Sequence, residues 1–496
     1  MKIWTDRAYP IILSCAKGLA PWVEREVGAL GYRPVDVTEN VVVVEGGMRD
    51  VFALNLRLRT AHRVLVPLLR ATCRHVRELY TLVASIDWEN LLDPDGYFSV
   101  SSIVHNDTVR DTRLPSLVTK DAVADRMRAK CNRRPDSGPD YDQGAAVFLH
   151  WERQRAIVYL DTSGAPLCKR GYRKIPGSAP MQETLAAACI DAMKWNRRTP
   201  FISPMCGSGT PAIEAALAAI GRAPGSLRAH FAFMSIKGYN QIIEGERAPR
   251  AAPRQRFGAT PEQIWKDMVL EAAEQEKTSG LPPIIATDIS PEAVQNAQIN
   301  AHAAGVSQYI QFSACDFAET PIPQDVGEGF RKDGKVYKGC VFFNPEYGIR
   351  LGDPAELVPV YERIGAFMNE KCRGYVGGLI TGNPELSKMV NLYYVTRIPF
   401  YNGPIDCRLF IYPNCEIKGE TAGEPADETG GQPADETEGK PTDETGGQPA
   451  DETEGKPMDE TGGQPADETG GKPADETAEA KKGNDVDCAG QGEEGI

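Results

Sequence analysis

The sequence predicts an α/β protein in three parts: an α+β region, an open and mostly parallel sheet with helices, and a disordered tail. Strand and helix patterns alternate between residues 182 and 412, as in a doubly wound parallel sheet. Residues 9–160 mix helices with short strands and a hairpin, which is typical of an α+β region. Residues 417–496 carry a short acidic repeat without a hydrophobic pattern.

The negative charge of the chain lies in its tail. The 496 residues have a net charge of −14, and 41% of them are hydrophobic, which is enough for real cores. Residues 417–496 contain 23 acidic and 6 basic side chains, so residues 1–416 carry a net charge of +3. This mildly basic body is compatible with a polyanionic partner but does not establish one.

The tail repeats the motif Pro-x-Asp-Glu-Thr seven times at a period of eight residues, beginning at Pro425. A period of eight matches neither a helix nor a strand, and the repeats have almost no large apolar residues, so we expect disorder. A neutral repeat expansion is the simpler interpretation. An arm that screens nonspecific RNA or binds a basic partner is the functional alternative.

Membrane proteins and metalloproteins are disfavoured. No apolar run approaches the ~18 residues of a membrane span, and the first residues lack the apolar core of a signal peptide. The twelve cysteines are scattered singly, without Cys-x-x-Cys spacing, so we expect reduced thiols and no metal site. The sequence therefore indicates a cytoplasmic protein without a membrane partner.

The α+β region should begin with a strand, a helix that ends at Gly31 and a second strand that ends at Gly46. The expected strands are 9–15, 41–44, 64–66, 97–104, 145–150 and 156–160, and the expected helices are 19–30, 51–58, 76–86 and 118–130. Basic residues gather between Arg110 and Arg134, where a solvated helix face and loop is the simpler interpretation.

The sheet region should alternate helices and strands. The expected helices are 182–195, 212–220, 264–275, 291–304 and 355–371, and the expected strands are 201–202, 284–287, 310–312, 341–343, 375–381 and 409–412. Residues 236–258 are rich in Pro, Gly and Arg and predict an exposed basic loop. Ligands of such sheets bind at the carboxyl ends of the strands, so the polar residues there are candidates for a site.

Among these candidates, the stretch Ser203–Thr210 gives the strongest indication of a ligand site. It turns from a strand through Gly207 and Gly209 into a helix, which brings bare backbone N–H groups and a helix N-terminus to the sheet edge. Neither a dinucleotide fingerprint nor a Walker loop fits this stretch, because the third spaced glycine and the Gly-Lys-Ser/Thr ending are missing. A tight structural turn is the plain alternative.

Several segments together resemble the bacterial THUMP-domain class I S-adenosylmethionine-dependent RNA methyltransferases, and within them the group that methylates guanine N2 of large-subunit rRNA. They occur in the family's order over about residues 10–412, and the combination is more specific than any one of them. The segments are Leu167–Arg173, Glu183–Ala188, Pro204–Thr210, Arg222–Gly225, Asn344–Gly348 and Asn402–Cys407.

The resemblance implies a ferredoxin-like region at 1–70, a THUMP RNA-binding region at 71–165, a Rossmann-like methyltransferase domain at 166–416 and the tail at 417–496. Larger relatives carry a second methyltransferase domain that makes 7-methylguanine. The resemblance implies that this second activity is absent from the present chain.

The resemblance also implies S-adenosyl-L-methionine as the cofactor. The expected cofactor-binding residues are Pro204, Cys206, Gly207, Ser208, Gly209, Thr210, Asp288, Asp316 and Phe317. Asp288 suits the ribose diol, since a carboxylate accepts two hydroxyl donors at once, and Asp316 suits the adenine amine with Phe317 beside the ring. For each acid, an ordinary helix cap or loop residue is the plain alternative.

The expected catalytic residues are Asn344, Pro345 and Tyr347. Acceptors from the Asn344 side chain and the Pro345 carbonyl can hold the hydrogens of an exocyclic amine, and Tyr347 can stack on a base flipped out of its helix. No metal is needed, because the chemistry consists of positioning the amine in line with the sulfonium.

The expected substrate-binding residues are Lys169, Arg170, Tyr172, Arg173 and Glu346. The first four belong to a segment in which four cations surround an aromatic ring, which suits phosphates and a stacked base, although a basic linker fits equally well. Glu346 could accept hydrogen bonds from the N1–H and NH₂ of guanine.

Two residues depart from the family pattern. Ser203 stands where the family usually has Asp, which removes an acceptor near the cofactor's ammonium, and Glu346 stands where it usually has Pro. RNA is the expected partner, either 23S rRNA or a ribosome-assembly intermediate. The alternatives are a tRNA guanine-N2 methyltransferase, a less favoured adenine-N6 enzyme, and an RNA-binding or assembly factor whose catalytic site has decayed.

Overall fold

The structure is a computed structural model. It describes residues 3–5, 7–111, 113–139, 144–177, 180–241, 259–326, 329–332, 335–348 and 353–413. The expected tail and most of the expected basic loop lie outside these residues. No helix in the described part of the chain is long and apolar enough to cross a membrane.

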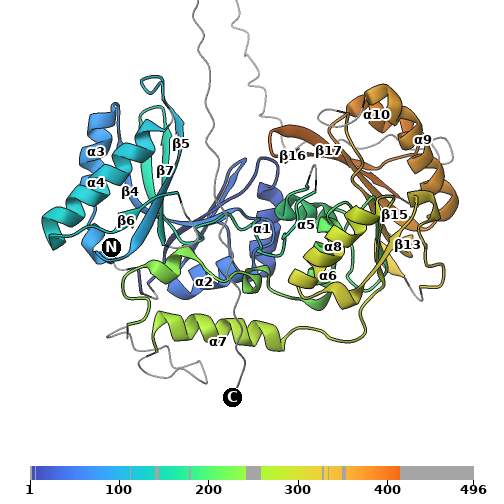
Figure 1. The fold of residues 1–496 in the computed structure, drawn as a ribbon, viewed down its shortest axis with the longest axis horizontal. Helices are drawn as coiled ribbons and strands as arrows, with labels where there is room; N and C mark the ends of the chain where they lie inside the picture. The colour runs from blue at the N-terminus through green and yellow to red at the C-terminus, as the bar shows by residue number, and fades with distance from the viewer. Residues whose placement is uncertain are drawn as a thin grey trace, which may run out of the picture. The chain divides into compact units, whose positions relative to one another are not determined.

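The N-terminal region is built on one eight-stranded sheet with the order β2-β3-β1-β4-β8-β7-β5-β6. Its strands are β1 (Tyr9–Ser14), β2 (Asp36–Val37), β3 (Val41–Gly46), β4 (Arg63–Thr72), β5 (Tyr97–His105), β6 (Asp136–Ser137), β7 (Ala145–Glu152) and β8 (Arg155–Asp161). Its helices are α1 (Ala20–Ala29), α2 (Met48–Arg57), α3 (Val76–Ala84) and α4 (Leu114–Cys131). Helices α3 and α4 pack side by side against the strands that include β5 (Figure 1).

Strand β4 joins the two halves of this sheet. It pairs with β1 through residues 63–65 and with β8 through residues 65–72, and it crosses the expected boundary between residues 70 and 71. The sequence predicted only 64–66 as strand, because Pro67 interrupts the pattern. The structure accommodates Pro67, which has no N–H to donate, with a shift of register between Pro67 and Leu69.

The C-terminal region is built on a seven-stranded sheet with the order β11-β10-β9-β14-β15-β17-β16. Its strands are β9 (Phe201–Pro204), β10 (Ile284–Asp288), β11 (Ile310–Ala314), β14 (Gly339–Phe343), β15 (Tyr375–Thr381), β16 (Thr396–Asn402) and β17 (Ile405–Tyr412). Its helices are α5 (Glu183–Ala192), α6 (Thr210–Ile220), α7 (Pro261–Glu274), α8 (Pro291–Ala303), α9 (Pro354–Lys371) and α10 (Pro384–Met389). A separate two-stranded ribbon consists of β12 (Phe330–Lys332) and β13 (Lys335–Tyr337).

This arrangement confirms the predicted α/β class. The first five strands of the order are parallel, and the chain order reverses at β9, which lies between β10 and β14. Such a reversal is the point at which ligands of open α/β sheets bind. The sequence missed β16, because Pro399 weakens its strand pattern, but β16 is an edge strand, where proline is tolerated.

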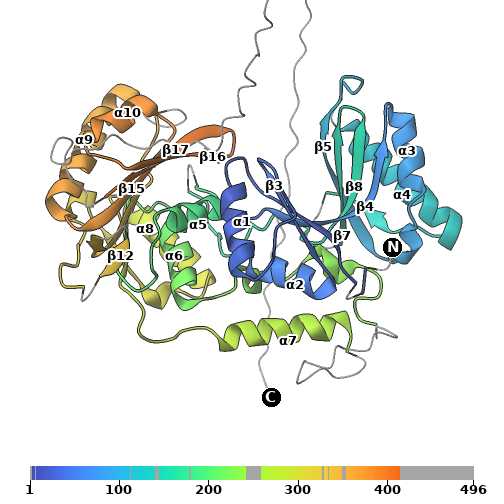
Figure 2. The same ribbon diagram turned by 180° about the vertical axis from the view of Figure 1, so that it is seen from behind.

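Aromatic side chains join α7 to the N-terminal region, below α2 in Figure 2. The Trp265 ring lies 5.9 Å from the Phe52 ring of α2 and 5.0 Å from Phe233, with both pairs edge to face. Thr260 begins α7 by accepting a hydrogen bond from the backbone N–H of Gln263 at 3.1 Å.

A buried ionic cluster makes a second junction. Arg170 is 1% exposed and lies 3.5 Å from the carboxylate of Glu214 in α6. Its guanidinium also donates to the carbonyls of Leu58, Arg59 and Leu167, so it ties the segment after α2 to α6. The prediction that Arg170 binds RNA is therefore wrong, because the interior of the protein already uses its charge.

Tyr172 belongs to the same cluster. Its ring is 1% exposed, and its hydroxyl donates to Glu214 at 3.1 Å. The prediction that Tyr172 stacks on a base is therefore also wrong. Burial raises the pKa of the Glu214 carboxyl above its ordinary value, although Arg170 opposes this shift.

Glu214→Gln should lower the free energy of unfolding by about 3–5 kcal/mol, because it leaves the Arg170 charge buried without its counter-ion. Urea unfolding measures the change. The matched control is Glu262→Gln, which breaks the exposed pair with Lys266 and should cost less than about 1 kcal/mol. Equal losses in the two variants would contradict this account of the cluster.

Candidate functional site

The glycine turn lies where the sheet order reverses. Gly207 has φ +54° and Gly209 has φ +85°, a left-handed region that favours glycine at both positions. A Cβ on Gly209 would lie 2.8 Å from the Cβ of Ala297 in α8, whereas a Cβ on Gly207 would meet open space. Gly209 therefore allows close helix packing, and the side of the turn at Gly207 is open.

Asp288 holds this turn in place. Its Oδ2 accepts a hydrogen bond from the Gly207 backbone N–H at 2.9 Å, and its Oδ1 accepts one from Ser290 at 3.0 Å. A carboxylate has about four acceptor positions, so one lone pair on each oxygen remains for further donors. The turn and Asp288, which come from neighbouring strands, therefore form one unit with free acceptor capacity.

Cys206 lies within the same turn and is 5% exposed. Burial and the nearby Asp288 raise the pKa of its thiol far above the ordinary value. The thiol therefore stays neutral and acts as an apolar packing group rather than as a nucleophile.

Asp316 follows β11 at the same edge of the sheet. Its Oδ1 accepts hydrogen bonds from the Ala318 backbone N–H at 2.9 Å and from Arg363 of α9 at 2.7 Å. The Arg363 hydrogen bond lowers the pKa of the Asp316 carboxyl. Asp316 is thus a turn cap, as the plain alternative expects, and its role towards adenine stays a prediction.

Phe317 is less accessible than the sequence suggested. Its ring is 5% exposed and packs edge to face on Phe343 and Phe367, each at 6.0 Å. The Arg363 guanidinium lies 4.8 Å from its centre. Phe317 therefore belongs to the hydrophobic core beside Phe343 of β14, and its contact with a base stays a prediction.

The segment Asn344–Tyr347 follows β14, which pairs with β9 beside the glycine turn. The Tyr347 hydroxyl donates a hydrogen bond to the Asn344 side-chain oxygen at 2.7 Å. Burial raises the pKa of this hydroxyl well above its ordinary value, so it remains a donor. Pro345 is buried, whereas the Glu346 side chain is exposed.

Two residues that sequence reasoning missed hold this segment. The Tyr361 hydroxyl donates to the Glu346 carbonyl at 2.9 Å, and the Asn383 side-chain N–H donates to the Tyr347 carbonyl at 3.3 Å. Asn383 also caps α10, and an Asn before a Pro is a signal of such a cap that the sequence offered. No sequence pattern marks Tyr361, because its partner is distant along the chain.

Lys169 and Arg173 complete the basic segment. Lys169 is exposed, which is compatible with its predicted contact to RNA. Arg173 is partly buried and pairs with Glu183 of α5 at 2.9 Å. Within the described ranges, no group of three or more His, Cys, Asp and Glu side chains could hold a metal ion.

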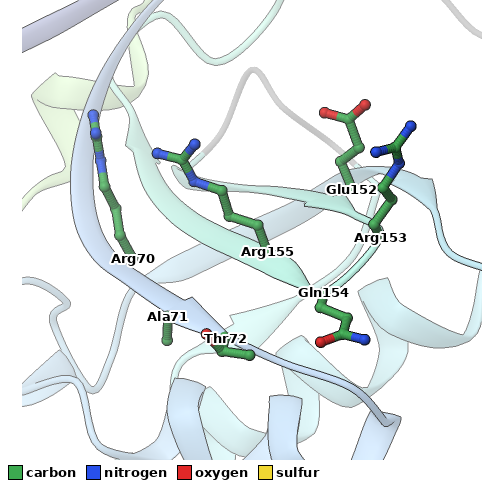
Figure 3. A pocket seen from close by; sticks show the side chains of 7 residues that line it. All are labelled: Arg70, Ala71, Thr72, Glu152, Arg153, Gln154 and Arg155. Atoms are coloured by element: carbon green, nitrogen blue, oxygen red, sulfur yellow. The ribbon is translucent and has the colours of Figure 1, made fainter. Parts of the chain in front are cut away.

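A separate basic hollow of about 710 Å³ lies at the tip of the β7–β8 hairpin and the end of β4 (Figure 3). Its lining residues are Arg70, Ala71, Thr72, Glu152, Arg153, Gln154 and Arg155. Figure 3 shows the arginines and Glu152 on one side of the strands. The sequence analysis did not single out these arginines, because they come together only through strand pairing.

Three domain families match the chain in succession. An RlmL ferredoxin-like domain matches residues 10–65, a THUMP domain matches residues 73–161, and an RMKL-like methyltransferase domain matches residues 170–411. The curated relative "Ribosomal RNA large subunit methyltransferase K/L" of Methylococcus capsulatus is 32% identical over 425 residues, which are 84% of this chain and 53% of the relative. The chain thus spans about half the length of this relative.

Solved structures share the fold. The protein SMU.472, described as a putative methyltransferase and solved with SAH, has a TM-score of 0.66 at 24% identity, covering 84% of this chain and all of that one. A Listeria monocytogenes protein described as a predicted N6-adenine-specific DNA methylase has a TM-score of 0.65 at 27% identity, over 82% of this chain and 96% of that one. TrmN from Thermus thermophilus, at 16% identity and a TM-score of 0.54, shows the fold alone.

The fold and the succession of matched domains define a THUMP-domain class I methyltransferase, and the chain belongs to that family. Within the family, its ferredoxin-like domain and its curated relative place it with the RlmL group. These matches confirm the resemblance that the sequence segments indicated.

Asp288→Ala should accelerate hydrogen exchange at the backbone N–H groups of Gly207 and Ser290, because both lose their acceptor. Exchange measured by mass spectrometry or NMR checks this result. In the control Asp316→Ala, the Ala318 N–H should be affected, and the two other N–H groups should not. Unchanged protection of Gly207 in Asp288→Ala would show that the carboxylate does not hold the turn.

Proposed function

We propose that this chain is an S-adenosyl-L-methionine-dependent RNA methyltransferase that modifies the exocyclic N2 of a guanine in 23S rRNA. The observation that carries the proposal is the position of Asn344–Tyr347 beside the glycine turn where the sheet order reverses. The name of the curated relative supports rRNA as the substrate. A cytoplasmic location belongs to the same proposal.

The residues of the turn fit the proposed cofactor. Gly207 leaves the open side of the turn free, and Asp288 keeps acceptor capacity that suits the ribose hydroxyls. SMU.472, which shares the fold, was solved with the product form of this cofactor. S-adenosyl-L-methionine supplies an electrophilic methyl group at its sulfonium.

The protein's own contribution is to orient the target amine. The Asn344 oxygen accepts from Tyr347 through one lone pair, and the second lone pair can accept a hydrogen of the substrate NH₂. The Pro345 carbonyl is proposed as the second acceptor. Holding both hydrogens favours development of the nitrogen lone pair and aligns the amine, so positioning supplies the catalysis.

The basic hollow is a proposed contact for the RNA backbone. Some exposed arginines of the N-terminal region are paired with acids, as in Arg113–Asp111, Arg128–Asp125 and Arg133–Asp95. By contrast, the described residues include no acid within ion-pair distance of Arg70, Arg153 or Arg155. Guanidinium groups without a protein partner are suited to phosphate.

Asn344→Ala should abolish methyl transfer while leaving cofactor affinity nearly unchanged, because the amide orients the amine rather than the cofactor. Asp288→Ala should instead weaken cofactor binding by about 1–3 kcal/mol. Calorimetry measures affinity, and mass spectrometry of nucleosides from rRNA and tRNA identifies the product.

Loss of cofactor binding in both variants would contradict the division of roles between Asn344 and Asp288. Methylation confined to tRNA would replace the rRNA substrate in this proposal. A wild-type protein that binds RNA but neither cofactor nor product form would support the decayed binding factor, in which Ser203 and Glu346 mark the loss of activity.

Replacing Arg70, Arg153 and Arg155 together by Gln should reduce the dependence of RNA binding on salt. Each lost phosphate contact lowers the slope of log K against log salt concentration by about 0.7–0.9, so the slope should fall by about 2–3. The matched control replaces Arg113, Arg128 and Arg133, whose charges are paired. Similar slopes for the two triple variants would exclude the hollow as a phosphate site.

A further inference from the structure

Arg173 and Glu183 form an ion pair beside the glycine turn. The Arg173 Nε donates to Glu183 Oε1 at 2.9 Å, its Nη2 donates to the Met181 carbonyl at 2.6 Å, and its Nη1 lies 3.4 Å from the Ser208 hydroxyl oxygen. The pair is partly accessible, with side-chain exposures of 17% for Arg173 and 8% for Glu183. A charged pair therefore borders the turn that the proposed cofactor uses.

Asn300 of α8 fixes the chain next to this pair. Its side-chain oxygen accepts from the backbone N–H groups of Lys174 and Ile175 at 2.8 and 3.0 Å. Its N–H₂ donates to the carbonyls of Ile175 and Ser208 at 2.9 and 3.0 Å. The buried amide thus uses both its donors and its acceptor to hold the segment after Arg173 against the turn.

Arg173 and Glu183 both keep hydrogen-bonding groups that could contact a ligand. The three contacts of Arg173 use three of its five N–H donors, which leaves one on each terminal nitrogen. The contact to Arg173 uses only Oε1 of Glu183. A ligand end with one carboxylate and one ammonium matches these free donors and acceptors in charge and in hydrogen-bond type.

We propose that Arg173 and Glu183 bind the amino-acid end of the cofactor, with Arg173 contacting the carboxylate and Glu183 contacting the ammonium. This inference rests on the proposed function and reassigns Arg173, which the sequence analysis attributed to RNA. Glu183 then supplies the negative charge that the chain lacks at Ser203. The cost of burying the ligand's charges is small, because each meets an opposite charge that is already desolvated and fixed.

Three ligands separate the two roles by calorimetry. S-adenosylhomocysteine has both charged groups, decarboxylated S-adenosylmethionine lacks the carboxylate, and 5′-methylthioadenosine lacks both. Arg173→Gln should weaken S-adenosylhomocysteine about 10- to 100-fold and leave the other two nearly unchanged. Glu183→Gln should weaken the two ligands that carry an ammonium and leave 5′-methylthioadenosine nearly unchanged.

Arg128→Gln is the matched control, because it removes an arginine from an exposed ion pair in the N-terminal region and should not change the binding of any of the three ligands. Unchanged binding of 5′-methylthioadenosine also shows that each variant keeps its adenosine site. Equal weakening of all three ligands would show that the pair merely holds the turn, and no weakening would show that it faces no ligand. Either result overturns the inference. Failure of the wild type to bind S-adenosylhomocysteine would instead reject the proposed function.

Discussion

The buried contact between Arg170 and Glu214 constrains both the glycine turn and the segment that leads to it. Both side chains are about 1% exposed, so each buried charge is stabilised by the opposite charge of the other. Glu214 lies in α6, the helix that begins at the glycine turn, and Arg170 also binds the carbonyls after α2. This ionic contact therefore helps to hold the helix of the candidate site against the N-terminal region, together with Arg59, whose guanidinium donates to the carbonyl of Leu217 in α6.

The segment after Arg170 connects this buried ion pair to the glycine turn. Tyr172 contacts the same Glu214, Arg173 contacts Ser208, and Asn300 holds the backbone of the next two residues. The segment thus runs from a buried anchor to the edge of the turn in a few residues. A continuous series of hydrogen bonds therefore links the buried ion pair to the turn.

Regular patterns made most of the fold predictable, and contacts between distant residues account for what was missed. The alternating strands and helices predicted the parallel sheet, and the strand ends predicted Asp288 and Asn344 at one edge. Composition alone does not distinguish a surface cation from a buried one, which is why the prediction that Arg170 binds RNA is wrong. Its carboxylate partner is 44 positions further along the chain, and only the fold brings them together. Tyr361 could not be predicted for the same reason, whereas the sequence marks Asn383 as a helix cap but not its contact with Tyr347.

The segment Asn344–Tyr347 is held in place by hydrogen bonds from the protein itself. Tyr347 fixes the Asn344 side chain, while Tyr361 and Asn383 fix the carbonyls of Glu346 and Tyr347. Tyr361 in turn lies 2.8 Å from the hydroxyl of Thr381 at the end of β15, so the supports come from the rigid sheet. In the proposed function, the second lone pair of the Asn344 oxygen would accept a substrate amine without loss of the Tyr347 hydrogen bond. The conformational entropy of this segment is therefore lost during folding rather than on substrate binding. Such a preorganised segment suits a reaction that is catalysed by positioning the substrate.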